Sequence, residues 1–235
     1  MNKSLRHLAV IMDGNGRWAQ AHGKQRLAGH RAGAETVERV LDWCRDAGIR
    51  YLTLYAFSTE NWKRSKEEVS GLMGLLGVFL RSKGGKLVKN RVRFRVIGRR
   101  EDLSRSLVAK IEDLERRTEA FDECQLILAI SYGGRAEIAA AAQRYAQDCV
   151  AGRVDPSEPL AEESFTRYLY APDVPDPDLI VRTSGEFRLS NFLLWQCAYS
   201  EFHSTTTLWP DFSKDDFDAA LAAYSSRNRR LGGRP

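Results

Sequence analysis

The chain of 235 residues has few cysteines and no long apolar run. The longest apolar stretch, 71–80, is about half of what a membrane-spanning helix needs. Segment 1–7 is polar and lacks the apolar core of a signal peptide. The cysteines stand far apart, without a CxxC pair or a histidine at zinc-ligand spacing, so reduced core thiols are expected. They are Cys44, Cys124, Cys149 and Cys197. We therefore expect a cytoplasmic protein that is not integral to a membrane.

The composition excludes the fibrous and disordered classes. Hydrophobic residues make up 43% of the chain and charged residues 29%, as in an ordinary globular protein. The formal charge of +5 favours anionic partners. Charge alone does not choose between nucleic acid, phosphorylated metabolites and a lipid surface, so the positions of the arginines must decide.

Apolar runs alternate with segments of helical periodicity along most of the chain. The alternation predicts an α/β fold, with one domain over 1–235 and a mostly parallel central sheet flanked by helices. Strands are expected at 8–12, 51–57, 92–97, 126–130, 179–181 and 192–195. Helices are expected at 30–47, 67–80 and 104–120, from 136 onwards, and after a capping Ser213.

Three polar segments follow expected strands, at the sheet edge where open α/β proteins bind ligands. In the first, Gly14 and Gly16 allow backbone amides to approach an anion closely. Arg17 can donate two parallel hydrogen bonds, and Asp13 can hold Mg²⁺ together with substrate phosphates. A plain Asp-Gly turn is the alternative, so this motif alone is weak evidence.

The second segment, 58–64, crowds polar side chains around Trp62 directly after a strand. An exposed loop that leads into the next helix would look the same. The segment gains weight only in combination with the other two.

The third segment, 181–191, contains two arginines, Arg182 and Arg188, with Ser, Thr and Gly between them. Such a pair is a natural clamp for a diphosphate. Glu201 follows and can complete a metal site with Asp13. A network of surface ion pairs is the alternative, and the occurrence of three such segments at strand ends makes it less attractive.

Taken together, these segments resemble the cis-prenyltransferase family, and within it the bacterial undecaprenyl diphosphate synthases. The resemblance rests on 10–18, 57–62 and 182–186, and on further agreement at 132–135, 190–196, 209–212 and 229–233. It covers the chain from about His7 to Gly233 in the right order.

The resemblance assigns a role to individual residues. It implies that Asp13 binds metal and is essential to turnover, and that Asn61 accepts the proton. The implied pocket for an allylic diphosphate comprises Gly14, Asn15, Gly16, Arg17, Trp18, Arg26 and His30. The implied second substrate loop comprises Ser58, Thr59, Glu60, Trp62 and Arg64. The implied site for isopentenyl diphosphate comprises Arg182, Arg188, Leu189 and Ser190, with Glu201 as a second Mg²⁺ ligand.

The implied activity is a Mg²⁺-dependent condensation of isopentenyl diphosphate with an allylic primer, farnesyl or geranyl diphosphate. The expected product is a long Z-polyprenyl diphosphate, undecaprenyl diphosphate, a lipid-carrier precursor for cell-wall synthesis. A short- or medium-chain product is the alternative. Chain growth needs an apolar tunnel, for which 69–80, 126–130 and the strand around Ala56 are candidates. The segment 230–232 resembles a motif that reaches the neighbouring subunit, which implies a homodimer.

The chain departs from the family pattern at three places. Ser131 replaces the usual asparagine, Ser65 a frequent proline and Leu231 the usual phenylalanine. None of them is expected to touch a metal or diphosphate ligand, so catalysis is expected to be intact. A catalytically dead partner subunit is the alternative, and the retained site residues argue against it.

Two other enzyme classes fit less well. A phosphatase of the aspartyl-phosphate type would need a second aspartate where Asn15 stands. A trans-type prenyl synthase would need aspartate-rich motifs in a helical protein. The nearest approach, 215–218, is better explained as acidic residues in the first turn of a helix.

The basic segment 89–100 alternates Arg91, Arg93 and Arg95 with apolar residues. Such a period of two predicts a strand with one buried and one basic face. A solvated edge strand is the usual case, and contact with anionic lipid headgroups is a second possibility. We expect no nucleic-acid partner.

Overall fold

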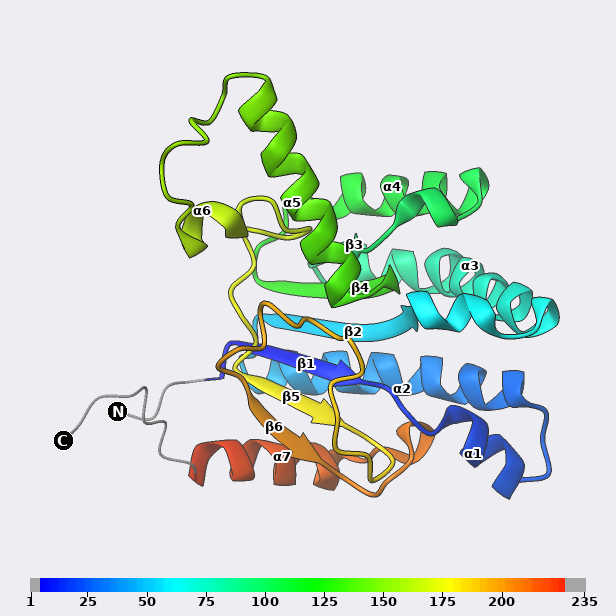
Figure 1. Cartoon of the computed structure of the whole chain (residues 1–235). Coiled ribbons are helices and arrows are strands. Elements are labelled where there is room, and N and C mark those ends of the chain that lie inside the picture. The colour runs from blue at the N-terminus through cyan, green and yellow to red at the C-terminus, as the bar shows by residue number, and fades with distance from the viewer. Residues whose placement is uncertain (1–4, 227–235) are drawn as a thin grey trace.

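The structure, a computed structural model, describes residues 5–226. One six-stranded sheet runs through the molecule in the order β3-β4-β2-β1-β5-β6, and every neighbouring pair is parallel (Figure 1). The strands are β1 (His7–Ile11), β2 (Tyr51–Ser58), β3 (Val92–Ile97), β4 (Cys124–Tyr132), β5 (Leu179–Arg182) and β6 (Glu201–Ser204). The parallel arrangement brings the carboxyl ends of all the strands to one edge of the sheet.

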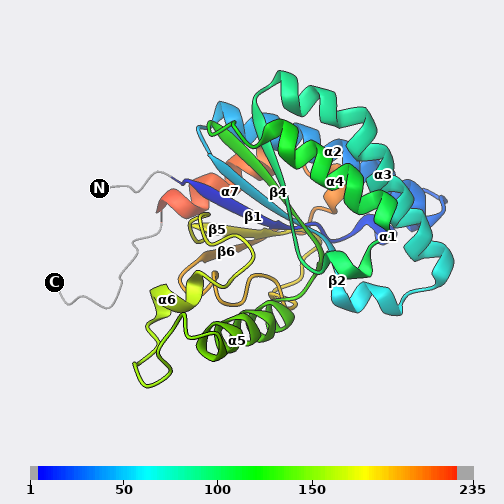
Figure 2. The same ribbon diagram turned by 90° about the horizontal axis from the view of Figure 1, so that it is seen from above.

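Helices cover both faces of this sheet, as the view from above shows (Figure 2). On one face lie α2 (Arg26–Asp46), α3 (Lys66–Lys89), α4 (Arg105–Thr118) and α7 (Lys214–Ser226). On the other face lie α5 (Gly134–Val150) and α6 (Glu162–Thr166). The short α1 (Asn15–Ala21) follows β1 at the carboxyl edge. No helix within residues 5–226 is long and apolar enough to cross a membrane.

Alternate residues of each strand supply two separate cores. Leu8 and Val10 of β1 pack with the layer that contains α2, α3, α4 and α7. Ala9 and Ile11 point the other way and pack with Phe192 and neighbouring apolar residues. This period of two is the geometry of a strand that is buried on both faces, so the apolar runs of the sequence correspond to central strands.

The expected elements are confirmed with two differences. Segment 192–195, predicted as a strand, is a series of turns, and the last strand is β6 instead. Positive φ angles at Ser190, Asn191 and Leu193 bend the chain there. Phe192 and Leu193 are buried because they cover a sheet face. Helix α3 also continues beyond residue 80 to Lys89.

Candidate active site

Asp13 stands just beyond the carboxyl end of β1. Its backbone N–H donates to Thr183 Oγ1 at 2.9 Å, and the Thr183 hydroxyl donates back to the Asp13 carbonyl oxygen. The next residue, Gly14, has φ 105°, and a Cβ there would approach Leu208 to 2.9 Å, so the turn requires glycine. The Gly14 N–H donates to Asp13 Oδ1 at 2.7 Å. This turn therefore fixes the carboxylate at the strand end.

Arg182, at the end of β5, is the principal partner of that carboxylate. It is 4% exposed, and its Nη2 donates to Asp13 Oδ2 at 2.8 Å. Its Nη1 donates to the carbonyl oxygen of Arg188 at 2.6 Å and to Ser190 Oγ at 2.7 Å. Its Nε–H is buried and has no acceptor among the described residues. A buried donor without a partner is costly, and an anionic ligand oxygen would satisfy it.

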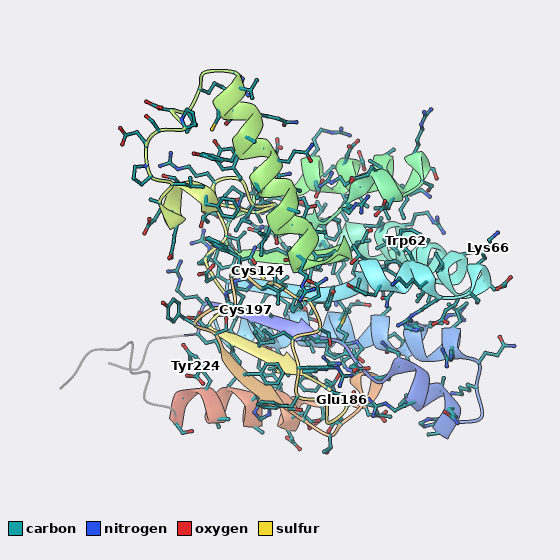
Figure 3. All side chains as sticks on the ribbon, viewed as in Figure 1. Trp62, Lys66, Cys124, Glu186, Cys197 and Tyr224 are labelled. Carbon is teal, nitrogen blue, oxygen red and sulfur yellow. The ribbon has the colours of Figure 1, made fainter. Side chains whose placement is uncertain are left out.

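Arg188, the other arginine of the predicted clamp, and Arg17 of the first polar segment both lie beside Glu186. Arg17 donates to Ser184 Oγ and lies 3.8 Å from Glu186 Oε1. Arg188 Nη1 contacts Glu186 Oε2 at 2.5 Å. Figure 3 shows Glu186 towards the carboxyl ends of the strands, the end where Trp62 also lies. Both arginines are half exposed, so they are positioned to meet a ligand at the rim rather than inside the site.

The second polar segment forms a short 3₁₀-helix, Thr59–Lys63, that is closed by a capping box. The backbone N–H of Ser58 donates to Asn61 Oδ1 at 3.0 Å, while the Ser58 side chain accepts from the Asn61 backbone. Reciprocal bonds of this kind satisfy the donors at a helix start. As a result, the amide oxygen of Asn61 is held at the turn.

Trp62 is anchored by a residue whose role the sequence did not reveal. Its Nε1–H donates to Ser131 Oγ at 2.8 Å, and the Ser131 hydroxyl donates to Asp102 Oδ2 at 2.6 Å. Ser131 was not expected to touch a metal or diphosphate ligand, but it does contact a residue of the predicted second substrate loop. In the sequence, Ser131 could be located directly before the 132–135 motif, but nothing indicated that Trp62 would be its hydrogen-bond partner.

Asn191 is a second residue that the sequence analysis did not assign to the site. Its Nδ2 donates to Glu60 Oε1 at 3.0 Å, and its Oδ1 accepts from the backbone N–H of Arg135 at 2.9 Å. Partial burial raises the pKa of Glu60, but hydrogen bonds from its own backbone, Asn191 and its loop neighbours outweigh this and leave the pKa below its ordinary value. Asn191 thus joins three separate chain segments.

His30 lies among charged side chains at the start of α2 and α3. Burial lowers its pKa to about 4, and the nearby Arg64 and Arg26 add to this, against the opposing effect of Glu68. Glu68 accepts from Arg64 at 2.9 Å and lies 3.5 Å from Arg26. His30 is therefore neutral at pH 7, and the bound negative charge of a ligand would raise its pKa.

An apolar cavity of about 570 Å³ opens between these groups. Its polar end contains many of the predicted site residues: Asp13, Asn15, His30, Ser58, Glu60, Asn61, Arg64, Arg182 and Ser190. Its apolar part runs between α3 and the sheet and is lined by residues of the three candidate tunnel segments: Ala56, Leu72, Met73, Leu75, Leu76, Phe79, Leu128 and Ile130. Other predicted residues do not line this cavity: Gly14, Gly16, Arg17, Trp18, Arg26, Thr59, Trp62, Arg188 and Leu189.

Glu201, the expected partner of Asp13 in a metal site, lies elsewhere. Glu201 is the first residue of β6 and pairs in register with Leu179 of β5, which pairs in register with Leu8 of β1. Asp13 follows Ile11 at the other end of β1. The levels of Leu8 and Ile11 alone are about 10 Å apart at about 3.3 Å per residue, whereas Mg²⁺ binds oxygen at about 2.0–2.1 Å. Within one chain the two carboxylates therefore cannot hold the same ion, which corrects that expectation.

Asp13 by itself still suits Mg²⁺, which commonly takes one or two carboxylates plus substrate phosphates. Its side chain is 33% exposed and lines the cavity. Between residues 5 and 226 no group of three or more His, Cys, Asp or Glu side chains is arranged to hold a metal ion. An ion bound here would therefore depend on ligand oxygens as well as on Asp13.

Comparison with known proteins identifies the family. The family model described as "Putative undecaprenyl diphosphate synthase" matches residues 11–232. An isoprenyl transferase of Thermotoga maritima is 51% identical over 227 residues, which cover 97% of this chain and 96% of that protein. One of Aquifex aeolicus is 50% identical, with 96% and 95% covered. The chain belongs to the cis-prenyltransferase family.

Solved structures of this family share the fold. Lavandulyl diphosphate synthase from Lavandula x intermedia, in complex with dimethylallyl diphosphate, matches with a TM-score of 0.94 and 36% identity, over 98% of this chain and 99% of that one. A probable undecaprenyl diphosphate synthase from Campylobacter jejuni matches with a TM-score of 0.82 and 37% identity, over 99% and 100%. Sequence and fold therefore both place this protein among the prenyltransferases.

Replacement of Ser131 by alanine is expected to loosen the 3₁₀-helix that carries Asn61. The Trp62 indole N–H would lose its acceptor, at a cost of roughly 1–3 kcal/mol for an unsatisfied donor. Amide hydrogen exchange by mass spectrometry should show faster exchange in 58–64. Ser225→Ala, whose hydroxyl donates within α7 to Leu221, is the control. Unchanged exchange in 58–64 would show that Ser131 does not anchor this segment.

The neutral state of His30 predicts a pH dependence of stability. Its folded pKa of about 4 lies below the ordinary 6.5, so between these values the unfolded chain binds more protons. The free energy of unfolding should therefore fall as the pH drops through this window. Between pH 7 and 4.5 the free energy of unfolding, measured with urea, should fall in both proteins. The fall should be roughly 1–2 kcal/mol smaller in His30→Gln than in the unsubstituted protein. An identical pH dependence in both would contradict the buried neutral ring.

Proposed function

We propose that this cis-prenyltransferase condenses isopentenyl diphosphate with an allylic diphosphate, farnesyl or geranyl diphosphate, to give a Z-polyprenyl diphosphate. The observation that supports it most strongly is the position of a buried arginine, Arg182, and its partner Asp13 at the mouth of an apolar cavity of about 570 Å³. Such a cavity accepts a hydrocarbon chain while the charged end holds diphosphate.

In this proposal the arginines stabilise the leaving diphosphate, and Asp13 would hold a magnesium ion that adds positive charge there. Arg182 offers its unsatisfied Nε–H to a diphosphate oxygen, and Arg17 and Arg188 stand at the rim. Asp13 is proposed as the protein ligand of Mg²⁺, which would neutralise charge on the diphosphate oxygens. Donors that are fixed before the reaction stabilise the charge as it develops. A ligand role for Glu201 remains a prediction from the resemblance alone.

Asn61 is proposed to act in proton removal through another group. Its amide oxygen already accepts from the Ser58 N–H, and an amide is a weak base. Its amide nitrogen has two N–H groups, which suit a water molecule or a phosphate oxygen. In this proposal Asn61 orients the proton acceptor, while a diphosphate oxygen or water takes the proton.

Undecaprenyl diphosphate is proposed as the product, with a short- or medium-chain product as the second candidate. The likeness to bacterial isoprenyl transferases over nearly the whole chain favours the first. The cavity volume favours the second, since about 570 Å³ is typical of a small-ligand pocket. A long product therefore requires the wall formed by α3 to move outward.

A homodimer is proposed from the exposed edge of the sheet at β6. Phe187 and Tyr199 are 78% and 75% exposed, and Phe187 packs against Phe202 of β6 with ring centroids 4.8 Å apart. Large exposed aromatic side chains beside an edge strand are typical of a subunit interface. The segment 230–232, on which the prediction first rested, lies outside the described residues.

The enzyme is proposed to work in the cytoplasm, beside the membrane that receives its product. The basic strand β3 is a weaker lipid contact than its sequence suggested. Arg95 pairs with Asp173 at 2.7 Å, Arg91 with Glu123 at 3.1 Å and Arg100 with Glu115 at 2.7 Å. These carboxylates offset most of the positive charge that the strand would offer to a membrane.

The test of the proposed reaction is incorporation of labelled isopentenyl diphosphate. Purified protein is supplied with dimethylallyl, geranyl or farnesyl diphosphate, with Mg²⁺ or with a chelator, and the products are resolved by chain length. We expect Mg²⁺-dependent elongation and a long product from farnesyl diphosphate. Failure to incorporate label with any primer would refute the synthase reaction, and release of inorganic phosphate without elongation would favour a phosphatase.

Replacement of Asp13 by asparagine is expected to lower kcat by at least about 100-fold, the usual scale for loss of one charge-stabilising group. Asparagine preserves an acceptor for the Gly14 N–H, so circular dichroism should show an intact fold. Asp113→Asn, which removes a surface carboxylate of α4, is the control. Near-normal turnover in Asp13→Asn would show that the metal site lies elsewhere.

A further inference from the structure

A second cavity, of about 610 Å³, lies on the far side of α3 from the active-site cavity. We call it the α3–α4 groove. It runs between the first half of α3, the start of α4 and the start of α2, which lie on the same face of the sheet (Figure 2). It is lined by Leu27, Arg31, Ser70, Gly71, Met73, Gly74, Leu75, Gly77, Val78, Arg81, Ser104, Ser106, Leu107 and Lys110.

Three cations meet in this groove and no carboxylate lines it. They are Arg31 from α2, Arg81 from α3 and Lys110 from α4. None of the three makes an ion pair or side-chain hydrogen bond with any residue between 5 and 226. Several other basic residues of the same helices are paired with carboxylates, for example Lys83 with Glu38 and Arg116 with Asp113. The groove thus concentrates positive charge that the protein itself does not balance.

The start of α4 adds to this positive potential. Ser104 caps the helix, its first turn contains no acidic residue, and its first N–H groups face the end where Ser104 and Ser106 line the groove. A helix N-terminus favours negative charge. The serine hydroxyls, which lie 3.2 Å apart, can donate to an anionic oxygen.

The floor of the groove is apolar and open. Among the glycines on this side of α3, only Gly74 has no heavy atom within 4 Å of its Cβ position, because Leu27 closes on Gly71 at 3.0 Å and Arg81 lies 3.8 Å from the Cβ position of Gly77. Leu27, Leu107 and Met73 supply apolar surface beside the open position at Gly74. Val78 is 48% exposed at its edge. An aliphatic chain can therefore lie along α3 beneath the three cations.

We propose that the α3–α4 groove docks an anionic phospholipid of a bilayer, with the headgroup phosphate at Arg31, Arg81 and Lys110 and acyl carbons along α3. The cations complement an anion, and the apolar floor complements a hydrocarbon chain. An anionic amphiphile therefore fits the groove better than a free phosphate, which has no apolar part to contact the floor. Each Lys or Arg near an anionic membrane contributes about 1 kcal/mol, or about fivefold in affinity. Three such cations together should raise the affinity of the protein for an anionic membrane on the order of 100-fold.

The groove lies directly behind the wall of the active-site cavity. Met73 and Leu75 line both the groove and the active-site cavity, so one helix separates the docked lipid from the growing chain. This consequence rests on the proposed function, whereas the lipid contact itself does not. An enzyme docked in this way holds the wall of its product cavity against the bilayer.

Co-sedimentation with vesicles tests the contact on the full chain. The vesicles are phosphatidylcholine alone or phosphatidylcholine with a quarter phosphatidylglycerol. The test variant combines Arg31→Gln, Arg81→Gln and Lys110→Gln. The charge-matched control combines Lys89→Gln, Arg91→Gln and Arg93→Gln in and beside β3. Binding of the unsubstituted protein should require phosphatidylglycerol and weaken with salt, and the groove variant should lose at least about tenfold in affinity while the control stays close to normal.

Three results would overturn the proposal. They are absence of phosphatidylglycerol-dependent binding, a larger loss in the β3 control than in the groove variant, and displacement of the protein from vesicles by inorganic diphosphate at constant ionic strength. Incorporation of isopentenyl diphosphate onto a soluble primer is measured in parallel and should be unchanged in the groove variant. If the protein binds vesicles but forms no product, the proposed reaction fails and the lipid contact stands.

Discussion

Arg182 enters the site from the last residue of β5 and meets the carboxylate of Asp13 just beyond the neighbouring strand β1. Because Arg182 is almost fully buried, its charge must be balanced locally. Asp13 supplies the countercharge, while the Arg188 carbonyl and Ser190 hydroxyl hold the guanidinium in place. The charged end of the site therefore depends on the pairing of these two strands, which brings together residues that are 169 positions apart.

The parallel sheet extends this arrangement to the rest of the site. β2 delivers the turn with Asn61, β4 delivers Ser131, and the turn after β5 delivers Asn191, all at one edge. Hydrogen bonds then join the segments directly, from Trp62 to Ser131 and from Asn191 to Glu60. Residues that are remote in sequence thus become neighbours because parallel strands align their carboxyl ends. Short crosslinks between loops supply the remaining precision.

Local patterns in the sequence were sufficient for most of the fold and for the polar end of the cavity. The buried strands, the Ser104 and Ser213 caps and the apolar face of α3 each have a local signature. Segment 192–195 misled because burial against a sheet face and burial within a sheet produce the same apolar run. A metal site shared by Glu201 and Asp13 within one chain was wrongly expected, and the bond from Trp62 to Ser131 was missed, because both depend on strand register and on partners far along the chain.

The two faces of helix α3 have different surroundings. Its inner face must be apolar to line the cavity, with Leu72, Leu76 and Phe79 towards the sheet. Its outer face has Gly71, Gly74 and Gly77, which contribute no side chains to seal the groove behind it. The packing behind the helix is uneven, because Leu27 closes on Gly71 and Gly77 is buried, whereas the Gly74 position is open. Outward displacement of this wall at Gly74 therefore costs less than displacement of the stretches of α3 that pack against α2 and α4.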